Sequence, residues 1–196
     1  MSKDAHRPDG IIGPNAILQM LPVLSDVLGK AERAQLLARA GIVDLPDGSC
    51  MIPEGDAARL HQQLRRDAPD AAPRIATRAG LNTADYILAH RIPKLAQTVL
   101  RILPATLAAN ILSKAIAKHA WTFAGSGAFS IVDPWHFEIA GNPIIRGEQS
   151  EACLCHWHAA VFTRLYRHLV TRGAFCVETT CCAQGAPACR FEITRE

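Results

Sequence analysis

The stretch that decides the fold lies near the C-terminus and reads Cys155-His-Trp-His-Ala-Ala-Val-Phe162, then Val177-Glu-Thr-Thr-Cys-Cys-Ala-Gln-Gly-Ala-Pro-Ala-Cys-Arg-Phe191. The first segment carries apolar residues at helical spacing, and the second reads as two strands joined by a Gly-Pro loop. Six of the seven cysteines lie in this part of the chain. Thiols crowded beside the carboxylate of Glu178 are typical of a metal site, because Zn²⁺ takes Cys, His and carboxylate ligands. We therefore expect a Zn²⁺ that joins the start of a helix to a pair of strands.

The spacing leaves three interpretations of these cysteines open. In the first, a closed tetrahedral site takes four groups, which are Cys155, Glu178, Cys181 and Cys189. Glu178 and Cys181 face opposite sides of a regular strand, so Cys182 is the alternative ligand unless a bulge or strand end near Thr180 intervenes. In the second, the cysteines are inert core residues, since Cys is among the most buried residue types. The third is an iron–sulfur cluster, although the chain has no C-x2-C-x2-C run.

The composition narrows the classes of function. The 196 residues are 49% hydrophobic and 20% charged with a net charge of +3, which is ordinary for one globular domain. The absence of a Lys/Arg run and of a Cys/His finger spacing argues against nucleic-acid binding. The N-terminus lacks the apolar core of a signal peptide, and polar residues interrupt the stretch 95–117 too often for a membrane span. We therefore expect a cytoplasmic protein, in whose reducing compartment a disulfide framework is not expected.

The hydrophobic pattern predicts an α+β fold in three parts, which are a flexible lead-in (1–13), a helical region (14–119) and a region of strands with one helix (120–196). Helices are predicted over residues 17–28, 31–40, 54–67, 74–90, 94–119 and 155–170. Pro22 would kink the first of these or split it into two short helices, the fourth would break near Gly80, and the fifth would bend at Pro104. Strands are predicted over residues 122–132, 135–139, 175–182 and 189–194. This order implies a helical N-terminal half packed on a four-stranded antiparallel sheet, with a helix between the two strand pairs. The helix over 94–119 is apolar nearly all round, so we expect it to be buried or to line a cavity.

These motifs resemble a known family. The Cys155–Phe162 segment, Val177-Glu178-x-x-Cys181 and Gly185-x-Pro187-x-Cys189-Arg-Phe-Glu192 are similar to the 4-vinyl-reductase domain, in the region 120–195. Within that family, Gly13-Pro-Asn-Ala-Ile17 and the helical half resemble the bacteriochlorophyll-biosynthesis J proteins of phototrophic bacteria. The resemblance implies a fold shared with a vesicle-tethering (TRAPP) subunit family and related to haem-based gas sensors, with a small apolar ligand between helices and sheet. It also implies a structural zinc, whose ligands here would be Cys155, Glu178, Cys181 and Cys189.

The closer resemblance implies a chlorophyll precursor as ligand, such as Mg-protoporphyrin or divinyl protochlorophyllide. A tetrapyrrole is a planar apolar disc with acidic edges, so it needs an apolar cavity and peripheral cations. His136, His156 and His158 lie amid aromatic residues, and one of them could offer an imidazole to the Mg²⁺, with His136 and His158 the favoured candidates. The alternative for each is a surface or hydrogen-bonded core role. The other candidate ligand-binding residues are Trp121, Phe123, Trp157, Arg91 and Arg101. For each aromatic among them taken singly, a place in the core is the favoured interpretation.

We expect a tetrapyrrole-binding accessory protein of bacteriochlorophyll biosynthesis that delivers a pigment intermediate between enzymes. The resemblance implies the large subunit of Mg-chelatase and Mg-protoporphyrin methyltransferase as partners, and a homodimer. The family name implies instead an 8-vinyl (4-vinyl) reductase, but Gly125-Ser-Gly127 lacks the third glycine of a dinucleotide fingerprint and precedes a strand. A small-ligand sensing module is the second alternative. Because a closed Cys3Glu site has no open coordination position, we expect the function to lie beside it, between the 94–119 helix and the sheet.

Overall fold

The computed structural model describes residues 10–195 of the chain. Of the predicted lead-in, residues 1–9 therefore lie outside the described part. The remainder differs from the prediction, because β1 (Ile11–Ile12) is a strand that pairs antiparallel with β2 (Ile52–Pro53). Ile12 and Ile52 point into the core, and this burial holds the start of the chain against the helices.

The helical half begins with five helices, which are α1 (Asn15–Leu18), α2 (Met20–Leu28), α3 (Lys30–Arg39), α4 (Glu54–Asp67) and α5 (Ala72–His90). The predicted split of the first helix into two short helices is present, but the break lies at Gln19, between α1 and α2, and not at Pro22. Pro22 sits in the first turn of α2, where a missing N–H costs no hydrogen bond. Gly41 follows α3 with φ of 68°, in the left-handed region that ends many helices.

The predicted break in α5 near Gly80 was wrong, since the helix is continuous through this residue. A Cβ at Gly80 would lie 2.3 Å from the carbonyl oxygen of Trp157 and 2.7 Å from the Cβ of Ala160. Glycine is therefore present because the neighbouring helix α9 (His156–Leu169) packs directly against the backbone of α5.

The predicted long helix over 94–119 is two helices, α6 (Lys94–Ile102) and α7 (Ala105–Lys118), separated at Leu103-Pro104. The expectation that it is buried all round was wrong, because the side chains of Leu95 and Ile102 are 77% and 76% exposed. Only one side of each helix packs on the protein. On α7 that side consists mostly of small residues, which are Ala108, Ala109, Leu112, Ser113 and Ile116.

The sheet contains β3 (Ala128–Asp133), β4 (His136–Ala140), β5 (Ala174–Thr180) and β6 (Cys189–Arg195), all antiparallel in the order β3-β4-β6-β5. The predicted first strand starts later than expected, because residues 121–124 form the short helix α8 (Trp121–Ala124). Gly125, with φ of 56°, ends α8 and turns the chain into the sheet. The α+β fold with a helix between the two strand pairs is confirmed.

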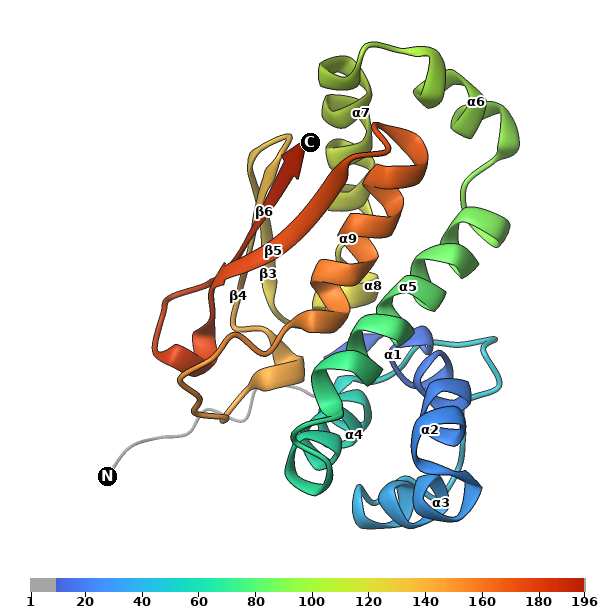
Figure 1. Cartoon of the computed structure of the whole chain (residues 1–196), viewed down its shortest axis with the longest axis vertical. Helices are drawn as coiled ribbons and strands as arrows, with labels where there is room; N and C mark the ends of the chain where they lie inside the picture. The colour runs from blue at the N-terminus through green and yellow to red at the C-terminus, as the bar shows by residue number, and fades with distance from the viewer. Residues whose placement is uncertain (1–9, 196) are drawn as a thin grey trace.

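Helix α9 lies between the sheet and α5, so the molecule has a layer of strands and layers of helices (Figure 1). Along the strands, buried apolar and exposed polar side chains alternate, as expected for a sheet with one covered face. Phe137 and Phe191 are fully buried against α9, whereas Glu138 and Arg190 form an ion pair on the opposite, uncovered face. Within the described residues, no helix is both long and apolar enough to cross a lipid bilayer.

Candidate metal centre

Four side chains from three parts of the fold meet at one end of the sheet. Cys155 precedes the first turn of α9, Glu178 lies on β5, Cys181 follows β5, and Cys189 begins β6. Their three sulfur atoms and one carboxylate oxygen all lie within 4.8 Å of one another. The structure thus brings together the four residues that the sequence singled out.

A bulge in β5 explains how Glu178 and Cys181 share a face. The register with β6 shifts between Glu178, which pairs with Phe191, and Thr180, which pairs with Arg190. One extra residue is thereby inserted, and the usual alternation of side chains is reset. The backbone N–H of Cys182 donates to the Sγ of Cys189 at 3.4 Å, while the Cys182 thiol points toward the carbonyl of Ile139. Cys181, and not Cys182, is therefore the cysteine in the cluster.

The cluster is buried and almost every polar atom around it is paired. Cys155, Cys181 and Cys189 are at most 1% exposed. The N–H of Cys155 donates to Oε2 of Glu178 at 2.6 Å, and the side-chain amide of Asn142 donates to the Sγ of Cys155 at 3.3 Å. The exception is Oε1 of Glu178, which is buried and has no hydrogen-bond partner. An unpaired buried carboxylate oxygen is costly and calls for a cation or a donor.

Burial shapes the protonation of these groups. It raises the pKa of Glu178 to about 7 and raises the pKa of the Cys155 thiol well above its usual range. The pKa of Cys181 is instead lowered, because the thiols of Cys155 and Cys189 both donate toward its sulfur. A thiolate among two thiols and a carboxylate is an arrangement that a divalent cation stabilises by displacing the remaining protons.

The geometry of the cluster fits a tetrahedral ion. The Sγ atoms of Cys155 and Cys189 are 3.5 Å apart. Zn–S bonds of about 2.3 Å at tetrahedral angles place two sulfurs roughly 3.8 Å apart, so little movement is needed. With four protein donors the site would be closed, which suits a structural ion that joins α9 to β5 and β6.

Three of the predicted ligand-binding residues lie together in the core beside this cluster. His158 is buried, and its Nε2 lies 3.2 Å from the carbonyl oxygen of Phe123. The centroids of the Trp157 and His158 rings are 4.8 Å apart. Trp157 Nε1 donates to Thr83 at 3.1 Å. Burial lowers the pKa of His158 to about 4, so its ring is neutral at pH 7. The side chains of Phe123, Trp157 and His158 therefore all pack against other aromatic rings.

The other four predicted ligand-binding residues lie elsewhere. His136 is on the uncovered face of the sheet, where Nδ1 lies 2.8 Å from a carboxylate oxygen of Asp133. Trp121 is 52% exposed on α8. Arg91 ends α5 and stacks over the ring of Tyr86, and Arg101 on α6 contacts His168. The structure therefore does not assemble these residues into one site.

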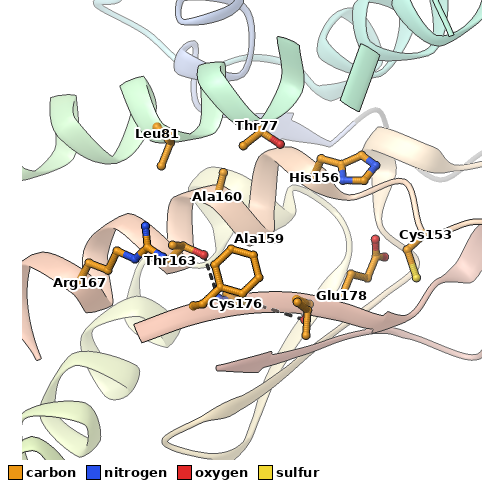
Figure 2. A pocket seen from close by; sticks show the side chains of 12 residues that line it. Thr77, Leu81, Cys153, His156, Ala159, Ala160, Thr163, Arg167, Cys176 and Glu178 are labelled. Atoms are coloured by element: carbon orange, nitrogen blue, oxygen red, sulfur yellow. Dashed lines mark hydrogen bonds between the residues drawn. The ribbon is translucent and has the colours of Figure 1, made fainter. Parts of the chain in front are cut away.

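A cleft of about 320 Å³ lies between α5, α9 and β5. The sequence had predicted a space between the 94–119 helix and the sheet instead. Figure 2 shows His156, Cys153 and Glu178 at one end of the cleft and Arg167 at the other. The sequence analysis considered His156, which belongs to the Cys-His-Trp-His motif, but favoured His136 and His158 over it. Burial, and then the charge of Arg65, lower the pKa of His156, so the cleft offers a neutral imidazole.

Comparisons with known proteins identify the family. The model of the 4-vinyl-reductase domain matches residues 135–195, which contain all four residues of the cluster. The bacteriochlorophyll synthase 23 kDa chain of Cereibacter sphaeroides is 54% identical over 191 residues, covering 96% of this chain and 91% of the relative. The chain of the same name from Rhodobacter capsulatus is 44% identical over 184 residues, covering 93% and 86%. The chain belongs to the family of bacteriochlorophyll synthase 23 kDa chains. The predicted membership of the 4-vinyl-reductase domain family is confirmed.

Solved structures similar to this member of the family are H-NOX proteins. A mutant H-NOX protein from S. oneidensis in the Fe(II) ligation state matches with a TM-score of 0.59 and 10% identity, covering 94% of this chain and 96% of that chain. The Fe(II) unliganded H-NOX protein from K. algicida matches with a TM-score of 0.57 and 9% identity, covering 94% and 97%. At this identity the likeness shows a shared fold and nothing about the ligand.

Proposed function

We propose that this chain is a tetrapyrrole-binding accessory protein of bacteriochlorophyll biosynthesis. It binds a Mg-porphyrin or divinyl protochlorophyllide and delivers it between the Mg-chelatase large subunit and Mg-protoporphyrin methyltransferase. The observation that carries the proposal is the 54% identity, over 96% of the chain, to a protein named as a bacteriochlorophyll synthase chain. A carrier needs a place to hold the pigment and needs no redox centre of its own.

The cleft between α5, α9 and β5 supports this proposal chemically. Its walls include small and apolar side chains, with the cation of Arg167 at one end and the neutral ring of His156 at the other. These two residues are eleven positions apart on α9, or about 16 Å along a helix, so they stand at opposite ends of the cleft. His156 would hold the Mg²⁺ at the centre of the pigment, and Arg167 would attract an acidic side chain that extends from the edge of the ring along the cleft. The cleft is at the small end of ligand sites, so a bound disc would stay partly uncovered and could be handed on.

We also propose that the Cys3Glu cluster binds a structural Zn²⁺. The ion would fix the start of α9 against β5, and both elements line the cleft. Bound zinc supplies only a fixed geometry here, because four protein ligands leave no position for a substrate. The cluster therefore shapes the pigment site and does not react with the pigment.

The carrier proposal is tested by titrating purified protein with Mg-protoporphyrin and with metal-free protoporphyrin while recording tryptophan fluorescence. We expect saturable quenching by both pigments. The His156→Ala variant should weaken the affinity for Mg-protoporphyrin about tenfold or more and leave the affinity for the metal-free pigment unchanged, because only the former needs an axial imidazole. The exposed His119 provides the control variant, His119→Ala, which should bind both pigments as the wild type does.

A flat titration with both pigments would overturn the carrier proposal. If His156→Ala weakened the affinity for both pigments equally, the carrier proposal would stand, but His156 would not be a ligand of Mg²⁺. Turnover of a divinyl pigment by the purified chain with NADPH would instead establish the vinyl reductase that the family name implies.

A further inference from the structure

The helices α6 and α7 carry an apolar surface that nothing in the described part of the chain covers. Leu95, Val99 and Ile102 lie at i, i+4 and i+7 on α6 and so share one face. Leu107 and Ile111 do the same on α7. All five side chains are more than 40% exposed. A gathering of large exposed apolar side chains on the outside of a fold marks an interaction surface.

The charges carried by α6, α7 and the segments that flank them all have one sign. From residue 86 to residue 132 the sequence contains no Asp or Glu. The same stretch contains the exposed cations Arg91, Lys94, Arg101, Lys114 and Lys118. In residues 10–195, none of these five side chains forms an ion pair with a carboxylate. The surface therefore combines an apolar face with uncompensated positive charge.

The position of this surface at one end of the molecule makes it accessible to a flat partner. Figure 1 shows α6 and the start of α7 at one end of the longest axis of the molecule, while the rest of α7 runs back alongside the sheet. The break at Leu103-Pro104 leaves two short helices at this end, and α6 packs on the rest of the protein mainly through Gln97 and Leu100. Leu95 and Ile102 point away from that contact and are the most exposed apolar side chains of the helix.

We propose that the α6–α7 surface docks on an anionic lipid bilayer. A short helix with an apolar face and flanking Lys and Arg lies in the interface of a membrane, with its apolar side chains inserted among the headgroups. Each nearby cation adds attraction to anionic lipids, and the long stems of Lys and Arg allow their charges to stay at headgroup level. A second copy of this chain fits less well, because a two-fold contact through this face would bring two sets of cations together without an acidic partner. The proposal is independent of the pigment-carrier function.

The test is co-sedimentation of the full chain with vesicles of phosphatidylcholine alone, or of phosphatidylcholine and phosphatidylglycerol in equal parts. We expect binding to the mixed vesicles that weakens as salt is raised, and little binding to phosphatidylcholine alone. The double variant Leu95→Asp/Ile102→Asp should lose about tenfold or more of the affinity, since it removes the inserted side chains. Both positions are exposed, so the variant should melt at the temperature of the wild type, which circular dichroism checks.

Two further variants make the test specific. The variant Lys114→Glu/Lys118→Glu should weaken binding at low salt. The control Val43→Asp alters a side chain that is 91% exposed outside this surface, and it should bind as the wild type does. The proposal is overturned if the wild type does not bind the mixed vesicles, or if the double variant binds equally well. It is also overturned if the wild type is a dimer by light scattering that Ile102→Asp converts to monomers, because the face is then covered by a second copy.

Discussion

The most informative single atom in the metal centre is Oε1 of Glu178. It is buried with no hydrogen-bond partner, while Oε2 of the same carboxylate accepts from the N–H of Cys155. The sequence predicted that Glu178 and three cysteines would come together, because each lies at the beginning or end of an element. It could not decide between Cys181 and Cys182, since the answer depends on a one-residue bulge that no spacing rule reveals.

The first prediction separates these two neighbouring cysteines. Cys181→Ser and Cys189→Ser should each abolish stoichiometric zinc and lower the free energy of unfolding by about 4 kcal/mol, because the proposed zinc would join α9 to the strands. Cys182→Ser should retain zinc and change the stability by less than about 1 kcal/mol. Metal analysis by mass spectrometry and urea unfolding measure both quantities. Full zinc in Cys181→Ser, or its loss in Cys182→Ser, would contradict the assignment of the cluster.

The second prediction concerns the loss of stability in acid that two buried histidines cause. Burial lowers the pKa of His61 to about 3 and that of His158 to about 4, from an ordinary value of 6.5. Below pH 6.5 the unfolded chain therefore binds protons that the folded chain does not, and stability is lost as the pH falls. On going from pH 7 to pH 5, each of the two histidines should lower the free energy of unfolding by about 2 kcal/mol.

A variant isolates the contribution of His61. The amide of His61→Gln can still donate to the carbonyl of Ala16, which the ring contacts at 3.0 Å, but it does not titrate. Urea unfolding at pH 7 and pH 5 should show about 2 kcal/mol less acid destabilisation than in the wild type. The exposed His119→Gln should keep the pH dependence of the wild type. Identical pH dependence in His61→Gln and the wild type would show that folding does not lower the pKa of this imidazole.

At the scale of elements, the sequence predicted the sheet and most helices, and its errors have two causes. Period-two and helical patterns located β4, β5, β6, α4 and α9 to within a few residues, because their buried faces are large and regular. Gly80 was interpreted as a break although it serves close helix packing, a tertiary contact that is not visible in a local pattern. The burial of the 94–119 region was overestimated because apolar content does not show which neighbours are present.

The third prediction tests the close approach of α5 and α9. Gly80→Ala would place a Cβ 2.3 Å from a backbone oxygen of Trp157, which can move only if the two helices separate. We expect a loss of about 3 kcal/mol in the free energy of unfolding, the upper end for overpacking a core. Gly55→Ala on α4 is the matched control, since its Cβ would meet only the flexible end of Arg59 at 3.4 Å. That control should be neutral or slightly stabilising. Equal stability of both variants in urea would mean that α5 and α9 are farther apart than the structure has them.

At the scale of the whole molecule, one carboxylate holds three distant segments together. Glu54, the first residue of α4, accepts hydrogen bonds from the N–H and hydroxyl of Ser126, at 2.7 and 2.6 Å, in the loop before β3. It also pairs with Arg146 at 2.8 Å, in the segment that leads toward α9. Burial works to raise the pKa of Glu54, but the hydrogen bonds and the charge of Arg146 outweigh it and hold the pKa below its ordinary value. No sequence motif predicts this contact, because Ser126 and Arg146 are 72 and 92 residues away from Glu54 along the chain.

The last prediction follows from that arrangement. Glu54→Gln keeps the shape of the side chain but loses the charge and half of its acceptors, so Arg146 and Ser126 are left incompletely paired. We expect the free energy of unfolding to fall by about 2 kcal/mol, and the melting temperature by roughly 4–8 °C. Glu32→Gln is the control, since Glu32 pairs with Arg39 in an exposed ion pair that solvent screens and that should contribute little to stability. Calorimetry measures both variants. If Glu54→Gln melted no earlier than Glu32→Gln, the contact between the helical half and the start of the sheet would be held by apolar packing alone.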